Sequence, residues 1–185
     1  MITNQDLVEL YGPENVVTVP ADEVERLRVR DADAEVLARV GIPAFSPVIF
    51  TNHVEGEPPF LEVFDVETKD GSVHREVLLG WVPDDPVINF SLDAQQGFVT
   101  FVQRTDPPQF DVVNNNLAEF VEFLYLIDRF RMQPVDDPEV HEKSRHELRD
   151  RLRAMDPFSF EAPDLWWPKV LARVAAPGPG IDAFA

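Results

Sequence analysis

Apolar residues recur along the chain with two different spacings. Up to about residue 45, and again after residue 113, the spacing is helical, whereas between Ser46 and Val113 short apolar runs alternate with turn residues. The connections between these runs are too short for crossover helices, so we expect about six mostly antiparallel strands. The pattern therefore predicts an α+β fold, in which this sheet packs against a central helix and further N- and C-terminal helices.

Turn residues mark where the expected strands begin and end. Asp70-Gly71 between two β-rich runs is the strongest hairpin signal, and the segment 93–97, which ends in Gly97, indicates a second hairpin. The expected strands are PVIFTN (47–52), PFLEVFDVET (59–68), SVHREVLLGWV (72–82), VINFSL (87–92), FVTFVQ (98–103) and FDVV (110–113).

Two short helices are expected before the strands. Thr3 has the position of an N-cap, with Asp6 three residues later. The second helix occupies residues 31–41, where Gly41 is placed as a left-handed cap. Pro43 follows and favours an extended exit, because the residue before a proline avoids helical geometry.

The segment richest in apolar residues predicts the central helix at residues 117–131. Asn116 is expected to be its N-cap, since an asparagine side chain readily accepts from backbone N–H groups in the first turn. Leu117 and Phe120 begin an apolar stripe that suits packing on the sheet, and a second apolar side runs beside it. One sheet cannot bury both sides, so we expect a second layer to cover the other one.

The C-terminal third supplies this second layer. A helix capped by Asp137 is expected to run along the surface to about Met155. The Trp166-Trp167 segment after it is expected to fold over the exposed side of the central helix. We expect one domain over residues 1–176 and a flexible tail at 177–185.

The composition excludes several classes of protein. The 185 residues contain no cysteine, which excludes disulfides, iron–sulfur clusters and cysteine-based zinc sites. No apolar run is long enough for a membrane span, and the N-terminus lacks a signal-peptide pattern, so we expect a cytoplasmic location. The formal net charge of −18 repels nucleic acid and anionic membranes and favours encounter with a cationic partner.

The sequence contains no motif that is typical of catalysis or cofactor binding. HEKSRH (141–146) differs from the zinc-protease motif, because its histidines are spaced i,i+5 and lie about 140° apart on a helix. No GxSxG, phosphate-binding loop or dinucleotide-binding motif occurs. We therefore expect a protein that is not an enzyme and that binds neither a metal nor a cofactor.

Four acidic loop residues are the candidates for contacts with a basic partner. They are Glu55, Glu57, Asp84 and Asp85, and their alternative role is to keep exposed loops solvated. His53 could hold a metal ion together with the first two, but a solvated acidic loop is the favoured interpretation. Trp81 and the two later tryptophans are large enough to anchor an interface, although burial in the core is the commoner fate.

Four segments carry a recognisable order: VLARVGIP (36–43), LLG (78–80), INFSLDAQQGFVTFV (88–102) and VVNNNLAEFVEFLYLI (112–127). Together they resemble the SUKH superfamily, and within it the fourth immunity subfamily. In the last segment Asn114, Asn116, Leu117 and Phe120 occupy matching positions, and Asn116 stands where serine is usual. Because serine and asparagine are comparable N-caps, this replacement is conservative.

The resemblance implies an α+β immunity protein that neutralises a cognate polymorphic toxin by stoichiometric binding and has no catalytic residues. A nuclease toxin would suit an acidic inhibitor, because the substrate groove of a nuclease is cationic. The alternative is a scaffold or regulatory binding module of the same superfamily that has no toxin partner.

Overall fold

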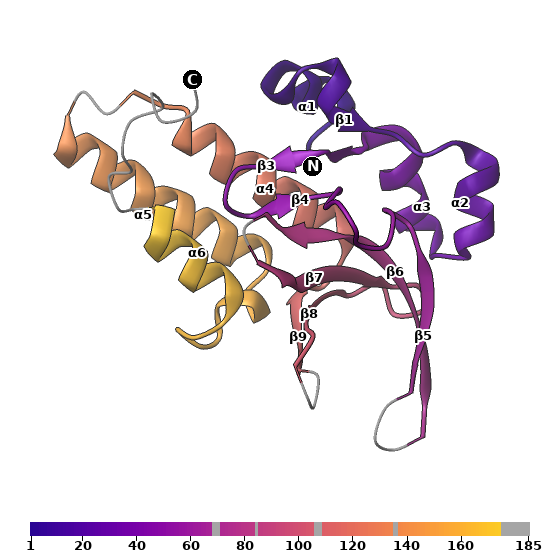
Figure 1. Cartoon of the computed structure of the whole chain (residues 1–185). Helices are drawn as coiled ribbons and strands as arrows, with labels where there is room; N and C mark the ends of the chain where they lie inside the picture. The colour runs from indigo at the N-terminus through magenta and orange to yellow at the C-terminus, as the bar shows by residue number, and fades with distance from the viewer. Residues whose placement is uncertain (68–70, 84, 106–108, 135–136, 175–185) are drawn as a thin grey trace.

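The computed structural model describes residues 1–67, 71–83, 85–105, 109–134 and 137–174 (Figure 1). The α+β fold is confirmed, with short N-terminal helices and longer C-terminal ones arranged around a large antiparallel sheet. No helix in these ranges is long and apolar enough to cross a membrane. The tail predicted at 177–185 and most of the turn predicted at Asp70-Gly71 lie outside the described residues.

The N-terminal part begins with α1 (Asn4–Tyr11), which has the predicted start. The Thr3 hydroxyl accepts from the Asp6 backbone N–H, and the Asp6 carboxylate accepts in return from the Thr3 N–H. The following elements are η1 (Pro13–Asn15), β1 (Val16–Val17), α2 (Ala21–Leu27), α3 (Asp31–Glu35), η2 (Val36–Val40) and β2 (Ile42–Pro43). β1 and β2 form a separate two-stranded antiparallel sheet.

Gly41 ends the second helical stretch, but the predicted left-handed cap is wrong. Its φ of 88° is positive, whereas its ψ of 176° is extended, so the chain passes directly into β2. The last helical turn is wide, because the Gly41 N–H donates to the carbonyl of Val36. The exit is extended as expected, and Pro43 pairs there with Val16.

The main sheet has the order β3-β4-β6-β7-β8-β9, and β5 pairs with the first half of β6. The strands are β3 (Phe45–Ser46), β4 (Phe50–Thr51), β5 (Val63–Glu67), β6 (Val73–Val82), β7 (Asp85–Asp93), β8 (Val99–Gln103) and β9 (Gln109–Asn114). All their pairings are antiparallel, as the short connections predicted. The strand predicted at 47–52 is confirmed only at Phe50–Thr51, which form β4, because residues 47–49 form a turn between β3 and β4.

The hairpin β7–β8 has its turn at residues 93–97. Asp93 Oδ1 accepts from the backbone N–H groups of Gln95 and Gln96, each at 2.8 Å. Gly97 follows with a φ of 78°, and a Cβ at this position would lie 1.7 Å from Arg30 Nη2. Glycine is therefore favoured here by the backbone conformation, and any larger residue would also have to displace the Arg30 guanidinium.

The main core lies between one face of the sheet and α4 (Leu117–Arg131). Asn116 is the N-cap of this helix and accepts from the Glu119 N–H at 2.9 Å. One turn into the helix, the fully buried Phe120 ring lies 5.7 Å from that of Phe50 and 5.3 Å from that of Phe90, centroid to centroid. The sheet and α4 are thus joined by an aromatic cluster.

A second layer covers the other side of α4, as its apolar circumference predicted. The elements of this layer are α5 (Pro138–Met155), η3 (Phe158–Phe160) and α6 (Trp166–Val174). The fully buried Trp167 packs 5.1 Å from Phe123 and 6.1 Å from Phe120. α5 lies on the surface, and Val140 in its first turn is 60% exposed.

Candidate functional site

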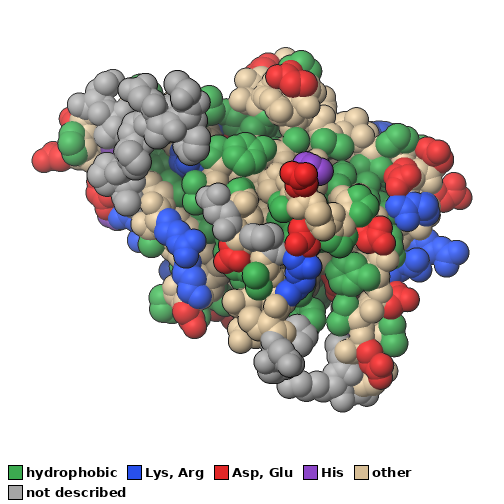
Figure 2. All heavy atoms as spheres, in the orientation of Figure 1, with side chains coloured by type: hydrophobic (Ala, Val, Ile, Leu, Met, Phe, Trp, Pro, Cys, Tyr) green, Lys and Arg blue, Asp and Glu red, His purple; other side chains and the backbone are tan. Residues whose placement is uncertain are grey.

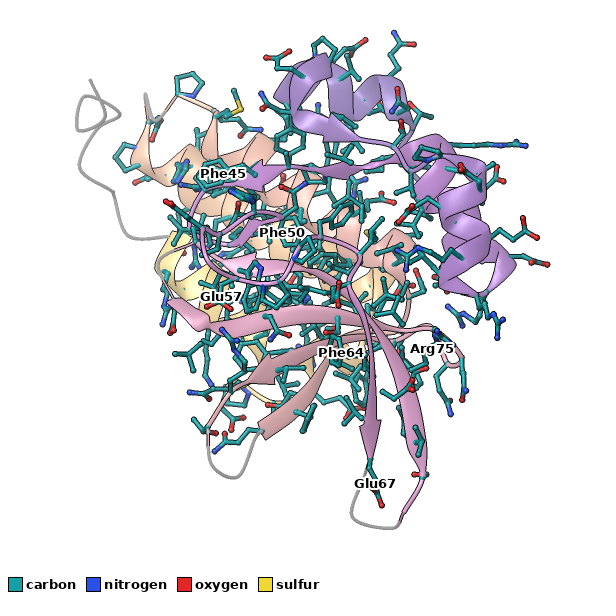
Figure 3. All side chains as sticks on the ribbon, turned by 45° about the vertical axis from the view of Figure 1, so that its right-hand side comes forward. Phe45, Phe50, Glu57, Phe64, Glu67 and Arg75 are labelled. Atoms are coloured by element: carbon teal, nitrogen blue, oxygen red, sulfur yellow. The ribbon has the colours of Figure 1, made fainter. Side chains whose placement is uncertain are left out.

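The stretch between β3 and β5, residues 45–62, forms a surface feature that we call the hairpin–loop segment. It consists of the hairpin β3–β4 and of the loop that returns from β4 towards β5. Figure 3 shows Phe45 on the hairpin and Glu57 on the loop, whereas Glu67 lies near the far end of the β5–β6 hairpin. The segment contains two of the four acidic residues predicted as partner contacts.

The turn of this hairpin has an unusual residue for its geometry. The Ile49 N–H donates to the Ser46 carbonyl at 3.1 Å, which closes a four-residue turn with Pro47 and Val48 in its central positions. Val48 has a φ of 70°. Proline followed by a residue with positive φ defines a type II turn, where glycine or asparagine is usual. A β-branched residue in this conformation is strained.

A chain of polar contacts holds the strained turn against α4. Arg131 Nη1 donates to the Pro47 carbonyl at 2.8 Å and to Asp128 Oδ1 at 3.2 Å. The Tyr11 hydroxyl of α1 donates to the other Asp128 oxygen at 3.0 Å. The pKa of the Asp128 carboxyl lies above its ordinary value because the group is buried. The contacts with Tyr11 and Arg131 act in the opposite direction and only partly offset this effect. Two helices thus fix the position of the turn.

The hairpin displays some of its apolar side chains and buries others. Phe50 and Ile49 are buried in the core, which anchors the hairpin. Phe45 and Val48 are 47% and 50% exposed. The hairpin therefore presents two large apolar side chains on a firmly held backbone.

The loop after the hairpin is fastened to the sheet. Glu57 Oε2 accepts from Arg104 Nη2 at 2.7 Å, and the Arg104 guanidinium lies 4.7 Å from the centre of the Trp81 ring. Trp81 itself is 1% exposed, so it is buried in the core, which was the favoured of its two predicted roles. At the end of the loop, the Leu61 N–H donates to the Leu78 carbonyl at 2.8 Å, with a φ of 66° at Leu61.

The predicted partner contacts differ in their surroundings. Glu55 is exposed in the loop, and Asp85 is exposed at the start of β7. Glu57 is largely occupied by its ion pair with Arg104, so it positions the loop as well as carrying charge. Asp84 lies outside the described residues. The exposed acids closest to the hairpin in sequence are thus those of the loop.

The hairpin–loop segment lies in an acidic stretch of the sequence. Residues 40–67 contain five Asp or Glu and no Lys or Arg. Figure 2 shows Asp and Glu side chains among apolar ones on the face that carries β3 and β4, with Lys or Arg side chains on the same face. Apolar residues surrounded by like charge are typical of the centre and rim of an interface.

A second polar cluster lies on β6 and β7, where Glu76 and Asp93 are directly opposite each other. Both are buried, and Asp93 Oδ2 lies 3.0 Å from His74 Nδ1. Burial, with a contribution from the charge of Asp93, raises the pKa of Glu76 to about 7. Burial also acts to raise the pKa of Asp93, but hydrogen bonds from the turn backbone and His74 hold it below its ordinary value. Glu76 is thus the carboxyl of this pair that takes up a proton.

The histidines of HEKSRH do not converge. His141 stacks on Phe130 with the ring centroids 4.7 Å apart, whereas His146 Nε2 lies 3.1 Å from the Glu142 carboxylate on the surface. Across the described ranges, no group of three His, Asp or Glu side chains is arranged to hold a metal ion.

Sequence reasoning missed the role of the asparagines before α4. Asp156, which follows α5, is fully buried. Its carboxylate accepts from the side-chain amide of Asn114 at 3.1 Å and from that of Asn115 at 2.7 Å. The Ser159 hydroxyl donates to it at 2.7 Å, and Trp167 Nε1 donates to Asn114 Oδ1 at 3.0 Å. These residues join β9 to the C-terminal layer and form a structural centre.

Comparison with known families assigns the chain to a class of proteins. The family of SUKH-4 immunity proteins matches residues 2–173, which is nearly the whole chain. The chain therefore belongs to the SUKH-4 immunity protein family. No curated protein and no solved structure matches it.

Proposed function

We propose that this chain is a cytoplasmic immunity protein that binds a cognate toxin stoichiometrically and thereby neutralises it. The observation that carries the proposal is the family match, which extends over residues 2–173 and thus includes every helix of the described residues apart from the last residue of α6. Neutralisation by binding needs a complementary surface and no catalytic group on the inhibitor.

The charge of the chain supports a basic partner. A net charge of −18 accelerates association with a cationic surface and disfavours binding to nucleic acid or to anionic membranes. A toxin that acts on nucleic acid has a cationic substrate groove. A nuclease is therefore the toxin class that we propose.

The contact surface that we propose is the acidic face around the hairpin–loop segment. Glu55 and Asp85 are exposed and could meet basic side chains directly. Glu57 is held by Arg104, so it would act mainly by keeping the loop in place. Loops positioned by a rigid sheet are common binding elements.

Co-expression tests the proposal. The toxin domain encoded beside the gene of this chain is expected to arrest the growth of a host when produced alone. Production of this chain in the same cells should restore growth, whereas an empty vector should not. Continued arrest, with the chain present in soluble form, would contradict the immunity function.

The alternative is a scaffold or regulatory binding module without a toxin partner. Such a module would use the same exposed surface, because folds of this kind do not by themselves define the partner. A gene neighbourhood without a secreted toxin would favour the alternative over the immunity function.

A further inference from the structure

We propose that Val48 and Phe45, at the tip and base of the hairpin β3–β4, form the apolar centre of the toxin-binding interface. The partner that fits them is a toxin face with an apolar depression surrounded by Lys and Arg. This inference rests on the proposed immunity function and specifies where and how the toxin is bound.

The first argument is that contacts within the chain do not offset the backbone strain at Val48. A valine with a φ of 70° is unfavourable, and burial of its side chain would be the usual compensation. Val48 is 50% exposed, so much of that compensation is missing. Strained backbone conformations are found preferentially at sites of binding or catalysis.

The second argument is that the other exposed apolar residues lack this feature. Val73, Val87, Phe110 and Val140 are 42% to 60% exposed. In the described part of the chain, Val48 alone among the large exposed apolar residues has a positive φ. Exposure alone is common on protein surfaces, whereas exposure combined with strain distinguishes this hairpin.

The third argument is that the hairpin is held ready for binding. Arg131 donates to the carbonyl of Pro47 at 2.8 Å and to Asp128, whose carboxylate also accepts from the Tyr11 hydroxyl. The two strands pair Phe45 with Thr51. A rigid apolar anchor loses little conformational freedom on binding, which increases affinity.

The fourth argument is charge complementarity. The exposed Glu55 belongs to the loop that continues from β4, within a stretch of 28 residues, 40–67, that has no Lys or Arg. The two arginines that reach this segment from elsewhere, Arg131 and Arg104, are each paired with a carboxylate, of Asp128 and Glu57 respectively. A basic rim on the partner would therefore meet the exposed Glu55 beside the apolar centre. Polar rims that exclude water from an apolar centre are the usual arrangement of binding hot spots.

The test uses Val48→Gly and Val48→Asn, because both residues are favoured at this turn position. Each variant should denature at the same or a higher urea concentration than the wild type, because strain is relieved. Each should nevertheless bind the purified toxin domain encoded beside this gene at least tenfold more weakly. Phe45→Ala should weaken binding to a similar degree.

The matched control is Val140→Gly, which alters an exposed valine in the first turn of α5. This variant should lower the denaturation midpoint, because glycine disfavours helix, and should leave the affinity for the toxin domain unchanged. At Val48 affinity should thus fall without a loss of stability, whereas at Val140 stability should fall without a loss of affinity.

Three outcomes would overturn the inference. Unchanged toxin affinity of both Val48 variants, with tight binding by the wild type, rejects this interface but not the immunity function. A wild-type chain that does not bind the toxin domain rejects both. A wild-type dimer that dissociates in the Val48 variants, with toxin binding intact, assigns the hairpin to self-association.

Discussion

Asn115 binds both oxygens of the Asp156 carboxylate. Its backbone N–H donates to Oδ2 at 3.1 Å, and its side-chain amide donates to Oδ1 at 2.7 Å. The two residues are 41 positions apart and lie at the end of β9 and directly after α5. This contact fixes the C-terminal layer to the sheet at the point where α4 begins.

Removal of the Asp156 carboxylate should therefore be costly. Asp156→Ala leaves the amides of Asn114 and Asn115 and the Ser159 hydroxyl without their acceptor in a buried place. We expect a loss of about 3 kcal/mol or more in the free energy of unfolding, measured by urea denaturation. Asp150→Ala, at an exposed position of α5, should change it by less than about 0.5 kcal/mol. Equal effects of the two substitutions would contradict the role of Asp156.

The start of α4 offers a second test of stability. Asn116→Ala removes the acceptor of the Glu119 N–H and should cost about 1 kcal/mol. Phe120→Ala removes a buried ring that touches Phe50, Phe90 and Trp167, and should cost about 3 to 5 kcal/mol. The same denaturation experiment measures both. Two neutral substitutions would show that α4 is not the centre of the core.

Local patterns were sufficient to predict α4 and its cap. The cap at Asn116 and the stripe beginning with Leu117 and Phe120 depend on residues within one or two helical turns, so spacing along the chain reveals them. The antiparallel hairpins likewise followed from short connections and turn residues.

Contacts between distant segments could not be predicted in this way. Asn115 has no visible partner in the sequence, because Asp156 reaches it only after α4 and α5 have folded. The first half of the strand predicted at 47–52 is a turn instead, held in part by a hydrogen bond from Arg131, 84 positions away, to Pro47. Glu57 was predicted as a contact with a basic partner, and its ion pair with Arg104, 47 positions later, could not be read from the sequence.

Glu76 should make stability depend on pH. Its pKa is about 7 in the folded chain against an ordinary value of 4.5, so between these values the folded state binds more protons than the unfolded state. The free energy of unfolding should therefore fall as pH rises from about 5 to 8, by up to about 3 kcal/mol from this group. Glu76→Gln does not titrate, and its stability should fall less over the same range. Parallel pH profiles for the two proteins would rule out the shifted pKa.

Salt should act mainly on the rate at which the toxin associates. Long-range attraction between the acidic chain and a basic partner is screened by ions, whereas contacts within the formed complex are screened less. We expect the association rate constant to fall about tenfold or more between 50 and 500 mM NaCl, with a smaller change in the dissociation rate. Stopped-flow fluorescence measures both rates. An association rate that does not depend on salt would argue against a basic partner.

Titration of the neighbouring toxin domain with this chain tests the immunity function most directly. Calorimetry and a parallel assay of toxin activity should give one binding event at a ratio of one chain to one toxin domain, and toxin activity should disappear at the same ratio. No measurable binding, with full toxin activity at a molar excess of the chain, would contradict the immunity function.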